Sequence, residues 1–264
     1  MRDPFSGPPL YSPSFVDALR AYAPELLTPP ALPPGVTPEV THGTTVAAMR
    51  FADGVVVAGD RRATEGMAIA QRDIEKVFPA DDYSAVAIAG AAGPGIEMTR
   101  LFQTELEHYE KVEGFPLSLE GKANKLGQMV RSNLPAAMQG LVVVPLFCGY
   151  DVRRGTGRIF RYDVTGGRWE DADYHTLGSG GRDARGSLKK RYRPDMERAA
   201  AVDAVIEALY DAADEDAATG GPDLIRNIFP LVATVTAKGY QRLEDDEVRA
   251  SAEKVVAARA GGEG

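Results

Sequence analysis

Strands and helices are predicted to follow one another in blocks along this chain, and that order limits the folds open to it. After residue 43, strand patterns come first, followed by two amphipathic helices, a second group of strands, two more helices, a strand and a closing helix. Strands joined by short turns favour antiparallel pairing, whereas a doubly wound parallel sheet needs strands and helices to alternate singly. We therefore expect an α+β fold of four layers, αββα, with two antiparallel sheets flanked by helix pairs.

Sequence periodicity places the individual strands and helices. Continuous or alternating apolar residues predict strands at residues 44–50, 54–60, 67–73, 76–80, 83–90, 141–152, 157–164, 169–174 and 230–243. Apolar residues at helical spacing predict helices at residues 96–114, 119–134, 183–192, 197–216 and 245–260. The link at residues 52–54 suits a tight hairpin, and we expect the strands at 67–73 and 76–80 to pair with each other.

The first 43 residues differ in composition from the rest of the chain. Ten of the 18 prolines fall within residues 1–38, which favours an extended, poorly packed segment with at most one short helix around residues 12–23. We therefore separate residues 1–43 from a folded domain at residues 44–264.

Composition excludes several classes of function. With 264 residues and 44% hydrophobic content the chain can bury a sizeable core, and its net charge of -8 argues against nucleic acid or an anionic membrane as a partner. No apolar run is long enough for a membrane span.

The single cysteine, Cys148, lies in an apolar run and predicts a buried thiol in a reducing compartment, with the cytoplasm as the default. The three histidines lack metal-ligand spacing, so we expect no metal and no cofactor.

The bond between Gly43 and Thr44 is where the sequence first suggests chemistry. If this bond is cut, Thr44 carries a hydroxyl nucleophile and a primary amine on one residue, so the amine can act as general base without a histidine. Gly43 has no Cβ and lets the backbone bend so that the Thr44 hydroxyl can attack the preceding carbonyl. We therefore expect self-cleavage between Gly43 and Thr44, with residues 1–43 as a propeptide that keeps the amine acylated.

Three further residues fit the needs of such a site. A fixed positive charge near the amine of Thr44 would favour its neutral form, and Lys76 is the candidate. A buried lysine needs a carboxylate partner, and Asp60 ends the strand that adjoins Thr44. The oxyanion of a tetrahedral intermediate needs a backbone N–H, which Gly90 could present at a strand-to-helix turn.

Each of these residues also has an ordinary structural explanation when it is taken alone. A threonine is common in strands, an aspartate often ends a strand at a turn, and a lysine is most often solvated. A glycine at a strand-to-helix turn, such as Gly90, needs no catalytic role. The catalytic interpretation therefore depends on the residues occurring together.

Several motifs together resemble one known family. They are "TTV" at 44, "AGDRRAT" at 58, "RDIEKVF" at 72, "AIAGAAG" at 87, "ELEHYEK" at 105, "GSG" at 178 and "DAADEDAATGGPD" at 211. Residues 44 to about 258 resemble a β subunit of the proteasome core particle of the bacterial, actinobacterial type, an N-terminal-nucleophile (Ntn) hydrolase. Asp60, Lys76 and Gly90 follow Thr44 by 16, 32 and 46 residues, as the family pattern requires. The resemblance implies a threonine endopeptidase with the Ntn-hydrolase fold.

The resemblance also implies roles for residues further along the chain. Ser179 and Asp216 would hydrogen-bond the amine and hydroxyl of Thr44, and Thr219 would share this role where many relatives have serine. Arg62 would support Lys76. The pocket for the substrate side chain before the cut would be lined by small and apolar residues, which favours cleavage after hydrophobic residues; these are Ala63, Thr64, Ile74, Phe78, Ile88 and Ala92.

Membership of this family would place the chain in a larger assembly. The resemblance implies heptameric rings of this subunit, stacked between rings of related α subunits, which degrade unfolded proteins to peptides in the cytoplasm. A ring-shaped ATPase would deliver the substrates, marked by a small ubiquitin-like protein. Neither nucleic acid nor a membrane is expected as a partner.

Three other functions compete with this interpretation. A simpler two-ring bacterial peptidase shares the chemistry, but its chains are shorter and lack a long leading segment. A nucleotide-binding enzyme is suggested by Gly90, Gly93 and Gly95, but their G-x-x-G-x-G order reverses the dinucleotide fingerprint and no phosphate loop is present. A non-catalytic ring subunit would typically lack the threonine, the lysine or the glycine. Inhibition by a threonine-directed boronate or epoxyketone would separate the peptidase from the nucleotide-binding alternative.

Overall fold

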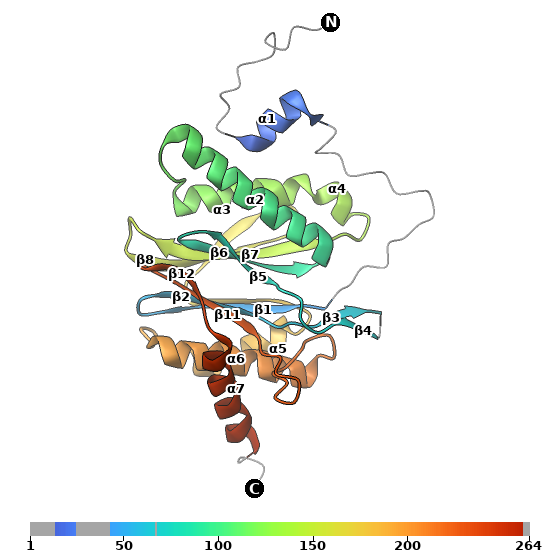
Figure 1. Ribbon diagram of the computed structural model, residues 1–264, viewed down its shortest axis with the longest axis vertical. Coiled ribbons are helices and arrows are strands. Elements are labelled where there is room, and N and C mark those ends of the chain that lie inside the picture. The colour runs from blue at the N-terminus through green and yellow to red at the C-terminus, as the bar shows by residue number, and fades with distance from the viewer. Residues whose placement is uncertain (1–13, 25–42, 67, 261–264) are drawn as a thin grey trace, which may run out of the picture.

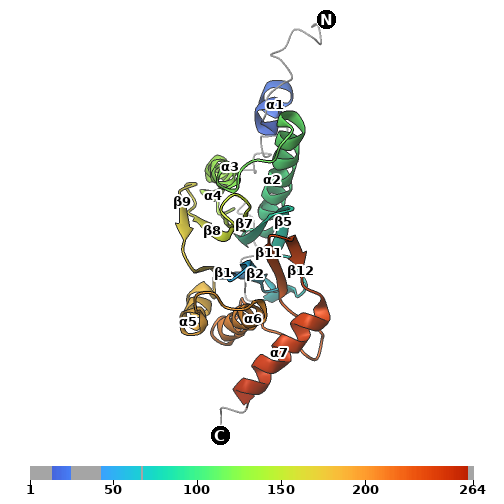
Figure 2. The same cartoon turned by 90° about the vertical axis from the view of Figure 1, so that its left-hand side faces the viewer.

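The computed structural model describes residues 14–24, 43–66 and 68–260. These residues form four layers in the order helices, sheet, sheet, helices (Figure 1). In Figure 1, α2 and α3 lie on one side of the two sheets, and α5 and α6 lie on the other; a view turned by 90° shows the same order (Figure 2). The predicted αββα fold is confirmed.

Two five-stranded sheets form the inner layers, and neighbouring strands run antiparallel in both. The first has the order β10-β1-β2-β11-β12 and consists of β1 (Thr45–Phe51), β2 (Gly54–Gly59), β10 (Tyr174–Gly178), β11 (Leu231–Thr236) and β12 (Gly239–Arg242). The second has the order β5-β6-β7-β8-β9 and consists of β5 (Val77–Asp81), β6 (Ser84–Gly90), β7 (Val143–Asp151), β8 (Thr156–Tyr162) and β9 (Arg168–Asp171).

Helices cover the outer face of each sheet. Those on the second sheet are α2 (Ala92–Glu113) and α3 (Leu119–Ser132), and the short α4 (Leu134–Ala137) follows them. Those on the first sheet are α5 (Gly181–Arg191) and α6 (Arg198–Glu215), with α7 (Asp245–Ala260) packed against α6. The predicted short helix near the N-terminus is also present, as α1 (Phe15–Tyr22), outside the α2–α3 layer (Figure 1).

Apolar side chains fill the three spaces between the four layers, and strand β1 contributes to two of them. Val46 and Ala48 face the second sheet, whereas Ala47 and Met49 face α5 and α6. Successive strand residues point to opposite faces of a sheet, so a strand buried on both faces is apolar throughout. Cys148 lies in the core between the sheets, as predicted, and burial raises the pKa of its thiol to about 12.

The predicted pairing of residues 67–73 with 76–80 is wrong. β4 (Ala68–Gln71) pairs instead with β3 (Ala63–Glu65) in a separate two-stranded sheet, and β5 joins β6 in the second five-stranded sheet. Gly66 has a φ of 55° at the turn between β3 and β4, a conformation that glycine adopts readily. Both segments have strand character, but their periodicity does not identify the neighbouring strand.

Two further boundaries differ from the prediction. The single strand expected at residues 169–174 is two strands, β9 and β10, which belong to different sheets, so the chain crosses between sheets at residues 172–173. Helix α2 begins at Ala92 rather than at residue 96, directly after the turn at Gly90. The segment at 230–243 forms the hairpin of β11 and β12.

The ends of three strands come together at one edge of the sandwich. β1 begins at Thr45, and β2 ends at Gly59 opposite Val46, which brings Asp60 beside the start of β1. The Asp60 N–H donates to the Thr45 carbonyl oxygen at 3.0 Å. β6 of the second sheet ends at Gly90. This edge therefore collects the residues that the sequence proposed for catalysis.

Candidate active site

Thr44 lies immediately before β1, and its hydroxyl is next to the carbonyl group of the preceding residue. Its Oγ1 donates a hydrogen bond to the carbonyl oxygen of Gly43 at 2.7 Å. The same oxygen accepts a second hydrogen bond, from Nζ of Lys76 at 2.9 Å. Thr44 is only 7% exposed. A hydroxyl and a cation thus meet at one carbonyl group in a site largely closed to water.

Lys76 and Asp60 form a buried ion pair beside this carbonyl. Nζ of Lys76 lies 2.6 Å from Oδ1 of Asp60, and their side chains are 3% and 0% exposed. The lysine also donates to the carbonyl oxygen of Arg62 at 2.6 Å. Asp60, Arg62 and Gly43 thus provide three acceptors for Lys76. An ammonium group has three N–H donors, so each donor has a partner. The cation is therefore held in one position.

The carboxylate of Asp60 is equally well occupied. Oδ1 accepts from the N–H of Thr45 at 2.7 Å as well as from Lys76. Oδ2 accepts from the N–H groups of Arg62 at 2.9 Å and Gly220 at 2.8 Å. Asp60 therefore joins the start of β1, the chain after β2 and the loop after α6.

Burial is the largest influence on the charge of Lys76. Removal from water lowers the pKa of Lys76 below its ordinary value, and the positive charge of Arg62 acts in the same direction. The charge of Asp60 and its hydrogen bond oppose this shift. Asp60 is therefore the main group that favours the charged form of the lysine, and Asp216 contributes in the same direction.

A second group of polar residues lies on the other side of Thr44. The Ser179 N–H donates to the Thr44 carbonyl oxygen at 2.9 Å. Oδ2 of Asp216 accepts hydrogen bonds from Ser179 Oγ at 2.5 Å and Thr219 Oγ1 at 2.6 Å. Partial burial acts to raise the pKa of Asp216, but these hydrogen bonds and that of the Ala218 N–H outweigh it and lower the pKa. Asp216 is therefore an acceptor for two hydroxyl groups.

Gly43 lies where no side chain would fit. A Cβ at this position would lie 2.6 Å from Thr64 Oγ1 and 2.8 Å from the carbonyl oxygen of Ala218. Contacts below 3.0 Å require one of these groups to move. The packing around the bond between residues 43 and 44 therefore accounts for the glycine.

A small pocket opens beside Thr44 and contains four of the six residues predicted to line it. Its walls are formed by Gly43, Thr44, Ala63, Ile74, Glu75, Lys76, Ile88, Gly90 and Ala92. Gly90 has a φ of 104°, and a Cβ there would lie 2.1 Å from the carbonyl oxygen of Val142. Only glycine fits this turn, which brings the backbone of residue 90 to the pocket wall next to Thr44.

A family model described as "Proteasome subunit" matches residues 40–225, which is most of the chain. The chain belongs to the proteasome subunit family. It is 65% identical over 207 residues to a protein of Acidimicrobium ferrooxidans named proteasome subunit beta, an alignment that covers 78% of this chain and 76% of that protein. It is 58% identical over 252 residues to a protein of the same name from Acidothermus cellulolyticus, covering 93% and 87%.

These matches confirm the resemblance to bacterial proteasome β subunits. The chain is a catalytic β-type subunit of the proteasome core and a threonine-type endopeptidase. Membership of this family places it in the rings of the core particle. The matching region ends at residue 225 and includes every residue proposed above for the site.

Two residues predicted to line the substrate pocket of this proteasome subunit, Thr64 and Phe78, are not among the residues that line the pocket beside Thr44. Phe78 packs on the core between the second sheet and α2. Thr64 is buried with its hydroxyl against Gly43. Glu75 was not predicted and does line the pocket, where it accepts a hydrogen bond from Arg242 at 2.7 Å.

Thr45 is a site residue that sequence reasoning missed. Its Oγ1 lies 2.6 Å from Thr219 Oγ1 and accepts from the Gly180 N–H at 3.0 Å. Because Thr219 donates to Asp216, Thr45 donates to Thr219, and a chain of hydroxyl groups connects β1 to Asp216. The second threonine of the "TTV" motif was the only sequence signal for this role.

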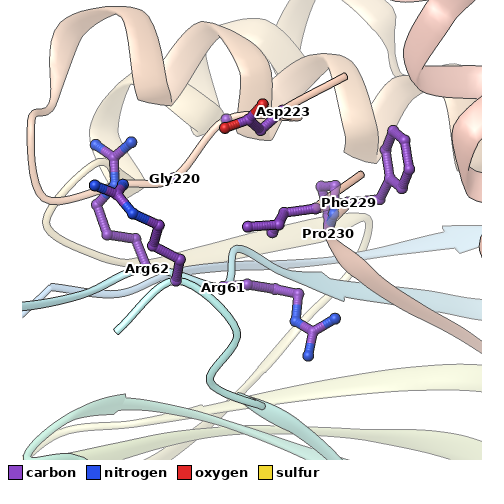
Figure 3. A pocket seen from close by; sticks show the side chains of 9 residues that line it. Arg61, Arg62, Gly220, Asp223, Phe229 and Pro230 are labelled. Carbon is purple, nitrogen blue, oxygen red and sulfur yellow. The ribbon is translucent and has the colours of Figure 1, made fainter. Parts of the chain in front are cut away.

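A second small pocket adjoins the Asp60 side of the proteasome site (Figure 3). It is lined by Arg61, Arg62, Arg72, Gly220, Gly221, Asp223, Ile228, Phe229 and Pro230. Figure 3 shows the side chains of Arg61 and Arg62 pointing in different directions. Arg62 and Gly220 also donate their N–H groups to Asp60, so this pocket borders the residues that hold the buried carboxylate.

In residues 14–24, 43–66 and 68–260, no helix combines the length and the apolar character that crossing a membrane requires. Within the same ranges, no group of three or more His, Cys, Asp or Glu side chains is arranged to hold a metal ion.

Proposed function

We propose that this subunit activates itself by cutting the bond between Gly43 and Thr44, and that residues 1–43 are its propeptide. The observation that carries the proposal is the pair of hydrogen bonds to the Gly43 carbonyl oxygen, from Thr44 Oγ1 and from Lys76 Nζ. The hydroxyl oxygen lies 2.7 Å from the oxygen of the carbonyl group that it must attack. The lysine charge would stabilise the negative charge that develops on the oxygen.

The cut proceeds in two steps. Thr44 Oγ forms a bond to the carbonyl carbon of Gly43, the bond from that carbon to the Thr44 nitrogen breaks, and the hydroxyl proton moves to the nitrogen. The product is an ester with a free amine on Thr44. Water then hydrolyses the ester, which gives a carboxyl group on Gly43 and restores the Thr44 hydroxyl. Water is the only reactant in these two steps that the chain does not supply.

In the mature chain the same residues act on a substrate peptide. The Thr44 amine accepts the hydroxyl proton as Oγ attacks the substrate carbonyl. Lys76 favours the neutral, basic form of this amine through its nearby positive charge, and Asp60 fixes Lys76. The Gly90 N–H is the proposed donor to the oxyanion, a role that its place on the pocket wall beside Thr44 supports.

Ser179, Asp216 and Thr219 are proposed to hold the Thr44 end in position. Ser179 contacts Thr44 through the backbone, and Asp216 connects to β1 through Thr219 and Thr45. These residues act by positioning.

The pocket beside Thr44 is proposed to receive the substrate side chain before the cut. Ala63, Ile74, Ile88 and Ala92 give it small, apolar walls, so we propose cleavage after hydrophobic residues. Thr64 and Phe78 are not included in this proposal, because neither is among the residues that line the pocket. A peptide library read by mass spectrometry would test this preference.

The wider setting of the subunit is also a proposal. We infer from its relatives that it stacks in heptameric rings with rings of α subunits, works in the cytoplasm, and receives tagged, unfolded proteins from a ring-shaped ATPase. Co-purification of the chain with an α subunit as one particle, and its resolution by electron microscopy, would test the ring composition.

The intact mass of the assembled protein tests the central proposal. Cleavage after Gly43 would leave 264 minus 43, or 221, residues beginning at Thr44. The same measurement on a Thr44→Ala chain is the control and should give the mass of the uncut protein. A wild-type subunit that hydrolyses peptides while residues 1–43 are still covalently attached to Thr44 would contradict the proposal.

A further inference from the structure

Glu105 opens the "ELEHYEK" motif, yet the catalytic site makes no use of it. It lies on α2, in the outer helical layer of the second sheet, and is only 2% exposed. A buried carboxylate must be paired or hydrogen-bonded. The partners of Glu105 therefore indicate what it binds.

The carboxylate of Glu105 receives the start of helix α1. Oε2 accepts the N–H of Phe15 at 3.0 Å, and Oε1 accepts the N–H of Val16 at 2.5 Å. The first N–H groups of a helix have no partner within the helix, and a negative charge at this end is favoured by the helix dipole. Glu105 thus supplies both a charge and two acceptors to α1.

Lys125 of α3 completes the contact. Its Nζ lies 3.1 Å from Oε2 of Glu105 and donates to Ser14 Oγ at 3.0 Å. Ser14 is the N-cap of α1, and its Oγ accepts the N–H of Asp17. The ring of Phe15 packs on His108 of α2, with 5.7 Å between the ring centroids. Side chains from two helices therefore surround one end of a third.

The position of α1 explains why these contacts form a binding site rather than part of the core. Both views place α1 outside the α2–α3 layer (Figures 1 and 2), and none of its residues is fully buried. Residues 25–42 are the only covalent connection from α1 to Gly43. Its attachment to the outer layer depends on the contacts described above.

We propose that Glu105 and Lys125 form a binding site for the N-terminal end of a peptide helix, and that α1 is its ligand. The contacts involve no covalent bond across the site. A cut between Gly43 and Thr44 therefore leaves these contacts in place, and the freed segment separates from the subunit only when α1 dissociates from this site. This second statement rests on the proposed self-cleavage, whereas the binding site itself does not.

Amide hydrogen exchange in the full chain tests the site without requiring cleavage. In a Thr44→Ala chain, which keeps α1 attached, the amides of Phe15 and Val16 should be protected. Glu105→Gln should speed their exchange about tenfold or more, because hydrogen bonds to a charged acceptor are stronger than those to a neutral one. Glu107→Gln is the matched control, since Glu107 is an exposed residue of the same helix paired with Lys111, and it should leave both amides unchanged.

Changes in α1 itself keep the test valid if a Glu105 variant does not fold. Phe15→Pro removes one donor at a helix position that tolerates proline, after a residue, Ser14, that is already extended. Phe15→Ala removes the ring and keeps the N–H. We expect Phe15→Pro to speed exchange at Val16 more than Phe15→Ala does. Equal effects of the two, or unchanged exchange in Glu105→Gln, would overturn the binding site.

Native mass spectrometry of the self-cleaved wild-type subunit tests retention. We expect a complex of residues 44–264 with residues 1–43 that is lost in Glu105→Gln but kept in Glu107→Gln. Release of the peptide from the cleaved wild-type subunit would overturn retention. A chain that is never cleaved would contradict the proposed function, and the exchange experiment would still decide whether the site binds α1.

Discussion

The two sides of Thr44 are built in different ways. On one side, Asp60 and Lys76 are almost fully buried, and every hydrogen-bonding position that they offer is occupied. On the other side, Ser179 is exposed and Asp216 half-buried, and they lie in loops after β10 and α6. The first side contacts the Gly43 carbonyl oxygen through Lys76, whereas the second contacts Thr44 through its backbone and through Thr45.

From this difference we expect the buried side to take part in the reaction and the loop side to hold Thr44 in position. A buried ion pair that loses one partner leaves an uncompensated charge, which is strongly destabilising. An exposed hydrogen bond can be replaced by water at a smaller cost. The buried side should therefore be intolerant of substitution, and the loop side should affect the rate and stability more gradually.

The largest effect is expected at the residue between the two sides. Thr44→Ala removes the nucleophile, and we expect peptidase activity to fall at least about a thousandfold, with residues 1–43 still attached. Fluorogenic peptide hydrolysis and intact mass measure these outcomes. Thr44→Ser keeps a hydroxyl and should still be cleaved. Full activity in the alanine variant would mean that Thr44 is not the nucleophile, and the two sides would then not be parts of one active site.

Lys76→Met tests the buried side. It leaves Asp60 charged without its cation, so we expect the free energy of unfolding to fall by about 3–5 kcal/mol and self-cleavage to stop. Urea unfolding and intact mass report the two effects. Lys111→Met, at an exposed lysine in a surface ion pair, should change the free energy of unfolding by less than about 1 kcal/mol. A similar fall in the free energy of unfolding in both variants would mean that the buried ion pair contributes no more to stability than the surface ion pair does.

Thr45→Val tests the connection between the loop side and β1. It removes a hydroxyl that contacts Thr219 and Gly180, and leaves the Gly180 N–H without this acceptor. We expect the free energy of unfolding to fall by about 1–3 kcal/mol and peptide hydrolysis to slow about tenfold. Thr104→Val, at an exposed hydroxyl on α2, is the control. Unchanged rates of peptide hydrolysis in Thr45→Val would contradict the proposal that the hydroxyl groups of Thr45 and Thr219 help to position Thr44.

The smallest expected effect is the pH dependence that Asp216 gives to the loop side. Its pKa is lower in the folded chain than in the unfolded chain. Its stabilising contribution is therefore complete above the unfolded pKa of about 3.9 and is lost as the pH falls through the folded pKa.

Ser179→Ala removes one of the hydrogen bonds that cause this shift. We expect the variant to be less stable than its parent by at most about 1 kcal/mol at neutral pH, and this deficit should shrink as Asp216 becomes protonated. Urea unfolding of both chains in a Thr44→Ala background, from about pH 3 to pH 7, measures the difference. A deficit that grows on acidification would mean that the pKa of Asp216 is shifted in the opposite direction.

The sequence predicted the buried side of the site better than the loop side. Asp60 and Gly90 follow recognisable strand patterns, and their distances along the chain from Thr44 match the family. The contact of Thr45 with Thr219 joins residues 174 positions apart, and no local pattern reports such a contact. Phe78 was predicted to line the pocket but packs against the core, because an apolar residue in a strand can face either a pocket or the core.

The same limit applies to the fold. The four layers could be predicted because helices and strands come in blocks with clear periodicity. The pairing of β4 and the separation of β9 from β10 could not, because both depend on where the chain crosses between sheets. Burial of Glu105 was equally hidden, since its cause is a contact with Phe15 and Val16, about 90 residues away.

The three hydrogen bonds of Lys76 have a consequence for the enzyme once it is active. One of the acceptors, the Gly43 carbonyl oxygen, belongs to the segment that the proposed cut separates from Thr44. If the freed Gly43 end moves away from Lys76, the buried ammonium group has one vacant donor, while the other two stay anchored to Asp60 and Arg62. The proposed first turnover, on the chain itself, would thereby leave a buried N–H donor that favours the binding of another carbonyl oxygen or anion beside the new amino terminus.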